Sequence, residues 1–417
     1  MKRIYLDYAA GTPVDPEVLR AMTPYFTERF GNPGSLHAFG QEAIAAVDRA
    51  REAIAASLGA DFRQILFTSS ATEANNLALR GAFAAARAWD EKARGAAPGA
   101  DARAAAPRIV ISAIEHESIL ETARDLAREG ADVVIVPVDA RGTVDEKKIK
   151  ESLTPSTILV SVMFANNEIG TVEPIARIAA IIKEFRTGLV AGAAAARVAP
   201  ARGYPLLHTD AVQALQFLDC RPAPLGADLM TFSSHKIYGP KGAGALYVRD
   251  QAFLAPIVTG GGQEFGLRSG TENVPAIVGF AEAVRIADAK REAERVRIGE
   301  LRGRLWRGIK TACPEAEVNG AADEGALDAP PDTLPNILNI YFPGRSAETL
   351  LTKLDLAGVA ASAGSACRAR AATASYVIEA LGCSKERARE SIRFGLGRPT
   401  TGEEIEAAVG ILRKALA

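Results

Sequence analysis

Hydrophobic residues recur along this chain in short runs that alternate with stretches of helical spacing. Between residues 60 and 250 the runs are apolar and often β-branched, a composition that favours strands. Alternation of this kind is typical of parallel strands joined by crossover helices, so we expect an α/β fold. The predicted strands are Ile65–Thr68, Ile109–Ile111, Val133–Val136, Leu159–Met163, Leu206–Thr209, Leu229–Ser233 and Ala243–Val248.

A docking helix is expected before the first of these runs. Gly59 stands where a left-handed C-cap favours glycine, so the helix should end there. The apolar residues that would share its buried face are Ile44, Val47, Ile54 and Leu58.

The length of 417 residues exceeds what one hydrophobic core usually serves, so two domains are expected. After the glycines at 260–262, a long polar helical stretch at 281–311 leads to a new strand-like run, Ile337–Phe342. We therefore place the boundary near residue 275. The expected parts are an N-terminal segment 1–15 that packs with the small domain, a large domain 16–274 and a small α+β domain 275–417.

Three stretches are rich in Ala, Gly, Pro and charge and have no periodicity, which predicts surface loops. They lie at 89–107, 187–204 and 319–333.

Charge and composition exclude several classes of protein. Lys and Arg number 49 against 50 Asp and Glu, so the net charge of −1 gives no overall field that attracts nucleic acid or anionic lipid. No apolar run approaches the ~18 residues of a membrane span, and the start of the chain lacks the apolar region of a signal peptide. We expect a cytoplasmic protein that binds its partners at local sites and makes no direct contact with nucleic acid or membrane.

The first candidate site is the turn after strand Ile65–Thr68. Ser70 and Glu73 form a capping-box pattern that opens a helix. Free backbone N–H groups and the helix dipole would hold a phosphate there, with the Thr72 hydroxyl adding a contact. Taken alone, the pattern favours an ordinary helix cap over a phosphate site.

Two further strand ends carry a lysine and a carboxylate. Lys236 follows Leu229–Ser233, where a buried ammonium is costly unless it is paired, has a lowered pKa or is bonded as a Schiff base. Asp210 ends another strand and could hold a protonated ring nitrogen, as in pyridoxal enzymes. The alternatives are a surface lysine on the turn Tyr238–Gly242 and an aspartate that caps the following helix.

His116 follows the strand at 109–111. It lacks the second histidine of a zinc-protease helix, so a metal is not expected, and stacking or proton transfer competes with a loop histidine as its role.

Cys367 stands among small residues and beside Arg368 and Arg370, cations that stabilise a thiolate. It is therefore the expected reactive cysteine. The other cysteines, interpreted as space-filling residues, are Cys220, Cys313 and Cys383.

The lysine, carboxylate, imidazole and phosphate turn all follow strands of one predicted sheet, at the edge where open α/β sheets bind ligands. In this order and context the chain resembles the pyridoxal-phosphate-dependent cysteine desulfurases, class V aminotransferases of the bacterial IscS and NifS kind. The resemblance runs from Tyr5–Asp7 to the C-terminal helix. The other matching segments include Phe30–Pro33, Ala71–Glu73, Glu115–His116, Ala165–Thr171, His208–Gln213, His235–Gly242, Arg268–Asn273, Gly364–Cys367 and Ser391–Phe394.

The resemblance implies the fold type I of pyridoxal-phosphate enzymes, with a mainly parallel seven-stranded sheet flanked by helices and a smaller α+β domain. It also implies that Lys236 bonds the cofactor, Asp210 pairs with the ring nitrogen, Gln213 contacts the ring hydroxyl and His116 stacks on the ring. The implied phosphate ligands are Ala71, Thr72, Ser233, His235 and, from a second subunit, Thr271. The implied substrate ligands are Asn167, which also contacts the cofactor, and Arg393.

The implied reaction converts L-cysteine to L-alanine. Lys236 removes the Cα proton and Cys367 takes the sulfur as a persulfide, which then serves iron–sulfur cluster assembly and tRNA thiolation. The implied partners are a second copy of the chain, an iron–sulfur scaffold protein and other sulfur acceptors. No stable metal site is expected, and Cys367 would at most be a transient iron–sulfur ligand.

Three alternatives stay open at this point. One is another pyridoxal-phosphate lyase or aminotransferase, such as a selenocysteine lyase, and another is a desulfurase dedicated to nitrogenase. The third is a sulfur-relay or scaffold-binding protein with a decayed site. The sequence departs from the family pattern in three respects: Ser70 replaces a usual glycine in the phosphate turn, Arg368–Ala374 replaces a hydroxyl-rich and acidic stretch that bears on the choice of partner, and the stretches 89–107 and 187–204 are longer than typical.

Overall fold

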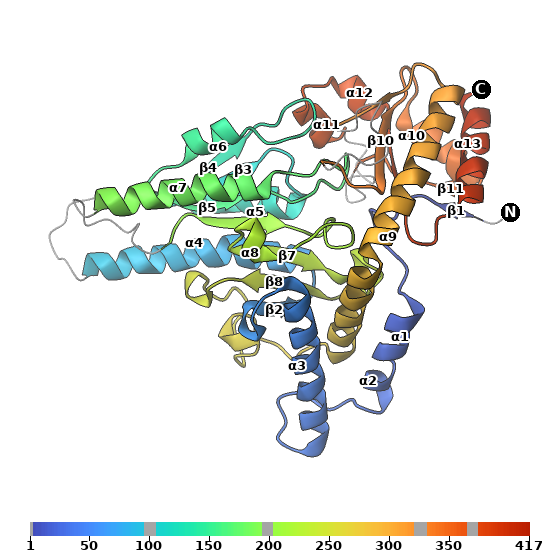
Figure 1. Cartoon of the computed structure of the whole chain (residues 1–417). Coiled ribbons are helices and arrows are strands. Elements are labelled where there is room, and N and C mark those ends of the chain that lie inside the picture. The colour runs from blue at the N-terminus through green and yellow to red at the C-terminus, as the bar shows by residue number, and fades with distance from the viewer. Residues whose placement is uncertain (1–2, 96–105, 194–202, 321–331, 365–373) are drawn as a thin grey trace.

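A seven-stranded sheet forms the centre of the computed structural model, which describes residues 3–95, 106–193, 203–320, 332–364 and 374–417 (Figure 1). Strand β8 runs antiparallel to both of its neighbours, and the other strands run parallel to one another. The predicted α/β fold with a mainly parallel sheet is confirmed. In spatial order the strands are β2 (Ile65–Thr68), β8 (Gly244–Val248), β7 (Leu229–Ser233), β6 (Leu206–Asp210), β5 (Thr157–Ser161), β3 (Arg108–Ser112) and β4 (Asp132–Val136).

Helices bury both faces of this sheet. Ile109 and Ile111 of β3 pack into one apolar cluster with α4 (Ala71–Gly95) and α5 (Glu117–Arg128), whereas Val110 packs into the cluster on the opposite face. Successive side chains of a strand point to opposite faces, which is why near-continuous apolar runs suit a sheet covered on both sides. The helices of the opposite face include α3 (Ala38–Leu58), α6 (Glu146–Ser152) and α7 (Ile175–Ala193).

The predicted docking helix is α3. Its C-cap, Gly59, has a left-handed backbone with φ 60°, and the Gly59 N–H bonds back to the last turn. The expected end of this helix is confirmed, because glycine adopts that conformation without steric cost.

Helix α9 (Val274–Ala312) runs from α1 and α3 to α13 and the elements near both termini (Figure 1). Strand β10 (Ile337–Tyr341) pairs antiparallel with β12 (Ser391–Gly395) and β9 (Glu317–Val318). Near the N-terminus β1 (Ile4–Tyr5) pairs with β11 (Val359–Ala360). The domain boundaries at 15 and 275 stay predictions. The remaining α-helices are α1 (Pro16–Met22), α2 (Pro24–Thr27), α8 (Pro222–Leu225), α10 (Ala347–Leu356), α11 (Tyr376–Ala380), α12 (Lys385–Arg389) and α13 (Gly402–Leu416).

The loop predictions at 89–107 and 187–204 are partly wrong. Helix α4 continues to Gly95 and α7 to Ala193, so 89–95 and 187–193 are helical. Residues 89–95 include Glu91, Lys92, Ala93 and Arg94, which have high helix propensities, whereas residues 187–193 continue α7 although they contain two glycines. The segments 96–105, 194–202 and 321–331 lie outside the described residues.

One predicted strand end was also wrong. Strand β5 ends at Ser161: the Met163 N–H donates to Glu115 Oε1 at 2.7 Å, although the N–H groups of Val162 and Phe164 still donate to carbonyls of β6. Within the described ranges, no helix has the length and apolar character that crossing a membrane requires.

Candidate active site

A cavity of about 240 Å³ opens where the carboxyl ends of β2, β3, β6 and β7 meet the N-terminal segment. Nine of the predicted site residues line it: Ala71, Thr72, His116, Asn167, Asp210, Gln213, His235, Lys236 and Arg393. The wall is completed by Ala9, Ala10, Ser70, Met163, Ala165 and Val212.

Two of the predicted site residues that the structure describes, Ser233 and Thr271, are not part of this wall. Ser233 is buried behind it, where its Oγ lies 2.9 Å from Nδ1 of His235. Thr271 is exposed and does not line the cavity within the described chain. Cys367 lies outside the described residues, and so do Arg368 and Arg370.

Lys236 ends the short 3₁₀ turn η3 (Ser234–Lys236) that follows β7. Its Nζ donates to the carbonyl oxygens of Ala9 at 2.7 Å and Ala10 at 2.8 Å. The Gln213 side chain donates to the same Ala9 oxygen at 3.0 Å. Lys236 is therefore a paired lysine in the wall of the cavity, not a surface lysine on the following turn.

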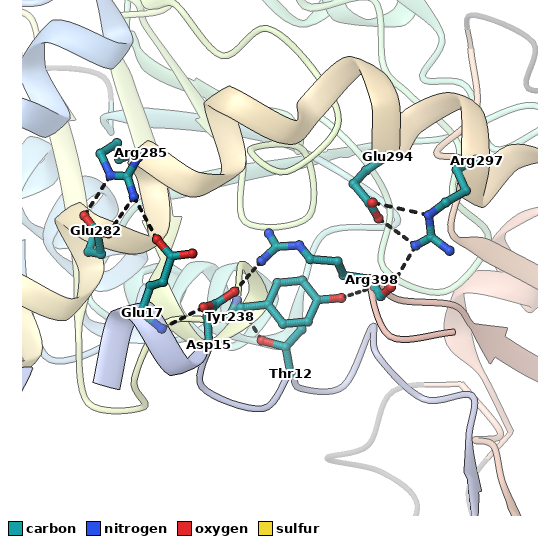
Figure 2. Close-up of polar contacts among 9 residues, drawn as sticks. All are labelled: Thr12, Asp15, Glu17, Tyr238, Glu282, Arg285, Glu294, Arg297 and Arg398. Carbon is teal, nitrogen blue, oxygen red and sulfur yellow. Dashed lines mark hydrogen bonds and ion pairs between the residues drawn. The ribbon is translucent and has the colours of Figure 1, made fainter. Parts of the chain in front are cut away.

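The turn after Lys236 is held by residues that lie far away in the sequence (Figure 2). Tyr238 has φ 69°, a left-handed conformation that is costly for a residue with a side chain. Its N–H donates to Thr12 Oγ1 at 2.8 Å, and its carbonyl accepts from the Asp15 N–H at 2.9 Å. The Arg398 guanidinium lies 4.2 Å from the centre of the Tyr238 ring and pairs with Asp15. These contacts fix the turn and thereby the direction of η3.

Asp210 is the last residue of β6 and has a hydrogen bond on each carboxylate oxygen. Oδ1 accepts from the Val212 N–H at 3.0 Å, and Oδ2 accepts from Asn75 Nδ2 at 2.8 Å. Both donors fix the orientation of the carboxylate, which can only accept when it is ionised.

His116 is the N-cap of α5, where its Nδ1 accepts from the Ser118 N–H at 3.1 Å. Burial lowers the pKa of His116; the charge of Asp210 opposes this effect and that of Lys236 adds to it. The imidazole is therefore neutral at neutral pH. A neutral ring whose Nδ1 accepts carries its proton on Nε2.

The turn before α4 forms one half of the predicted capping box, because the Glu73 side chain binds Ser69 N and not Ser70 N. Ser70 Oγ accepts from the Glu73 N–H at 3.2 Å, and Glu73 in turn accepts from Ser69 N and Arg268 Nε. Burial would raise the pKa of Glu73, but the hydrogen bonds of Arg268 and Ser69 outweigh it and lower the pKa. Ser70, which replaces a usual glycine, therefore acts as a cap, and the N-terminus of α4 faces the cavity beside Thr72.

Arg393 projects from β12 and is 1% exposed. Its Nη1 donates to the Asn167 carbonyl at 2.8 Å, and its Nη2 donates to Asp7 Oδ1 at 2.8 Å. Its buried Nε has no hydrogen-bond partner among the described residues. The guanidinium thus keeps donors available in the wall of the cavity, as a carboxylate ligand requires.

Glu115 lies directly beside His116 and is completely buried. Its Oε1 accepts from Ser112 Oγ and from the Met163 N–H, both at 2.7 Å. Desolvation nevertheless raises the pKa of this carboxyl to about 8, so the group is protonated at neutral pH. Glu173 is a second buried acid whose pKa is raised by burial to about 8.

We expect Glu115→Gln to change how stability depends on pH. At pH values between the ordinary pKa of 4.5 and about 8, Glu115 is ionised in the unfolded chain but protonated in the folded protein. Its contribution to the free energy of unfolding is therefore lost as the pH rises through this range. Relative to that of the wild type, the free energy of unfolding of the variant should increase by roughly 1 kcal/mol per pH unit across this range. Urea unfolding at several pH values measures this, with the exposed Glu121→Gln as control. Parallel pH profiles for wild type and Glu115→Gln would contradict the assignment.

The cysteines within the described ranges are free thiols. Cys220 and Cys313 are buried, and burial raises the pKa of both. They match the predicted space-filling residues, since a raised pKa leaves little thiolate. No group of three or more His, Cys, Asp or Glu that could hold a metal occurs in the described parts of the chain.

Sequence reasoning missed several contributors to the site. The carbonyls of Ala9 and Ala10 give no side-chain signal at all. Asn75 lies on the helix predicted after Ser70, and Ser118 lies on α5, which was not predicted; the spacing of neither residue indicated a role. Asp7 belongs to a segment matched by the family resemblance, but that resemblance assigned it no role.

The arrangement suits an aromatic aldehyde cofactor with a phosphate group. A primary amine at Lys236 can bond an aldehyde, the Asp210 carboxylate suits a protonated ring nitrogen, and the α4 N-terminus suits the phosphate. Pyridoxal phosphate combines these three features, so the residues present fit this cofactor.

Comparison with known proteins gives matches over nearly the whole chain. The model of the aminotransferase class-V family matches residues 4–408. The cysteine desulfurase IscS of Clostridium botulinum is 40% identical over 413 residues, which are 99% of this chain and 94% of the relative. That of Klebsiella pneumoniae is 42% identical over 418 residues, 99% and 92% of the two chains. A solved NifS-like protein, at 32% identity, superposes over 99% of both chains with a TM-score of 0.83.

Proposed function

The chain belongs to the class V aminotransferase family, and from this membership we propose that it is a pyridoxal-phosphate-dependent cysteine desulfurase. The observation that supports the proposal most strongly is that Lys236, Asp210, His116 and Arg393 line one cavity. The relatives named above are themselves desulfurases, which favours this activity over the other lyases and aminotransferases considered from sequence.

The cofactor would be held by residues around the whole cavity. Lys236 bonds its aldehyde carbon, Asp210 pairs with the ring nitrogen, and Gln213 lies within reach of the ring hydroxyl. His116 stacks on the ring as a neutral imidazole. The phosphate ligands are Ala71, Thr72, His235 and Ser233, whose hydroxyl also contacts the His235 ring. A second subunit supplies the remaining ligand, Thr271.

When bound, pyridoxal phosphate withdraws the electrons that are left when the Cα proton of an amino acid is removed. Lys236 is the base that takes this proton. The carbonyls of Ala9 and Ala10 receive its amine when it is not bonded to the cofactor, which keeps the amine beside the cavity.

The substrate is L-cysteine, whose carboxylate is received by Arg393 with Asn167 alongside. The Cys367 thiolate attacks the substrate sulfur, so that an S–S bond forms as the C–S bond breaks. The products are alanine and a persulfide on Cys367, and the atoms balance without an external reductant. The persulfide then passes to an iron–sulfur scaffold protein or to another sulfur acceptor, including the enzymes of tRNA thiolation.

The active form would be a cytoplasmic homodimer. Two features of the surface support a second copy of the chain: Thr271 is exposed, and four large apolar side chains around α2 and the start of α3 face solvent. These are Phe26, Phe30, Leu36 and Phe39.

The decisive experiment maps the products. Incubation of the cofactor-loaded protein with L-cysteine, without reductant, should give alanine and one added sulfur on the Cys367 peptide in a mass spectrum. A Cys367→Ala control should show no persulfide on any other cysteine. Full sulfide release by that variant in the presence of reductant would overturn the persulfide mechanism, and formation of pyruvate instead of alanine would overturn the desulfurase assignment.

A further inference from the structure

Asn75 is a buried polar residue behind the cavity for which the proposed reaction gives no role. It lies in the first turns of α4, is completely buried and does not line the cavity. Its Nδ2 donates to Asp210 Oδ2 and to Ser118 Oγ, both at 2.8 Å. Because a carboxylate can only accept, the nitrogen must face Asp210. The Oδ1 atom is left buried with no partner among the described residues.

The second N–H of Asn75 is linked to His116 through the Ser118 hydroxyl. Ser118 Oγ accepts from Asn75, so its own proton is available for His116 Nδ1, which lies 2.9 Å away. The Ser118 N–H donates to the same nitrogen. A single amide group therefore connects Asp210 with His116, two of the groups proposed to contact the cofactor ring.

We propose that Asn75 is a positioning residue that couples Asp210 to His116. This inference rests on the proposed function, because it assigns both groups to one cofactor. One N–H of Asn75 holds the carboxylate in place, and the other directs the Ser118 hydroxyl so that the imidazole keeps Nδ1 as an acceptor. The unpaired Oδ1 fits this role, because both amide protons are needed on the opposite side.

The coupling has an electrostatic consequence that can be measured. A hydrogen bond to a carboxylate disperses its charge, so without Asn75 the charge of Asp210 acts more strongly on its neighbours. The charged groups that act on His116 are Asp210, Lys236 and Glu117, and Asp210 raises its pKa. Removal of the Asn75 amide should therefore make His116 titrate at higher pH. The pH midpoint of the bound cofactor's visible band should also rise, because a stronger negative charge favours the protonated form of the cofactor.

The test compares Asn75→Ala with Asn76→Ala, its neighbour on the same helix, whose amide contacts Thr72, Arg80 and Thr122 instead. The chain has 4 histidines, so imidazole NMR of the cofactor-free protein can follow each one. In Asn75→Ala we expect the His116 midpoint to rise by about half a pH unit. In the cofactor-loaded protein the pH midpoint of the visible band should also rise. The Kd for pyridoxal phosphate should rise about tenfold. Asn76→Ala should leave both titration midpoints unchanged.

Unchanged titration midpoints in Asn75→Ala, with only a loss of thermal stability, would overturn the proposal and make Asn75 a packing residue. If Asn75→Ala does not fold, Ser118→Ala gives an independent test. This variant removes only the link between Asn75 and His116, so the titration midpoint of His116 should shift while that of the cofactor's visible band stays unchanged. If neither midpoint shifts, the coupling is overturned as well. The measurements on the cofactor-free protein stand even if the protein fails to release alanine from cysteine, so the two proposals can fail separately.

Discussion

Replacing Lys236 with alanine is expected to lower the rate of cysteine desulfuration about 10,000-fold, because one substitution removes both the covalent attachment of the cofactor and the base. The visible absorption band of the purified protein should be weaker or shifted, since the chromophore depends on the lysine. Single-turnover assays with added pyridoxal phosphate measure the residual rate.

Lys241 provides the matched control for this prediction. It lies on the turn that follows η3, is exposed and does not line the cavity, so Lys241→Ala should keep the band and most of the activity. A small primary amine such as ethylamine should restore part of the activity of Lys236→Ala, because it can replace the missing base. Near-normal turnover by Lys236→Ala without added amine would contradict the assigned role.

The seven strands could be predicted from the sequence because helices cover both faces of the sheet, and full burial imposes apolar runs. The active-site edge could be predicted because parallel strands bring residues that follow them to one place. Lys236, Asp210 and His116 each follow a different strand, and their shared chemistry outweighed the simpler interpretation of each residue taken alone. The helical ends of α4 and α7 could not be predicted, since residues 89–95 carry no apolar repeat and residues 187–193 contain two glycines, which have low helix propensity.

The contribution of the N-terminal segment was beyond sequence reasoning for a different reason. Ala9 and Ala10 act through backbone carbonyls, whose use depends only on where the chain passes. Asn75 was missed because an asparagine on a helix is usually a surface residue, and its burial arises from the packing of α4 against α5 and the sheet. Such residues become visible only when the three-dimensional contacts are known.

Arg393→Lys is expected to raise the KM for L-cysteine about 100-fold and to change kcat much less. Lysine keeps the positive charge, and its ammonium can still pair with Asp7. It cannot keep the hydrogen bond to the Asn167 carbonyl and also present a planar fork to a carboxylate, as the guanidinium does. The substitution should therefore weaken substrate binding much more than it slows turnover.

A stability measurement separates this effect from a damaged fold. Arg302 is equally buried, but it donates to the Leu334 carbonyl away from the cavity. Arg302→Lys should lower the free energy of unfolding without changing KM, whereas Arg393→Lys should change KM at a temperature where both variants remain folded. An unchanged KM in Arg393→Lys would mean that the substrate carboxylate binds elsewhere.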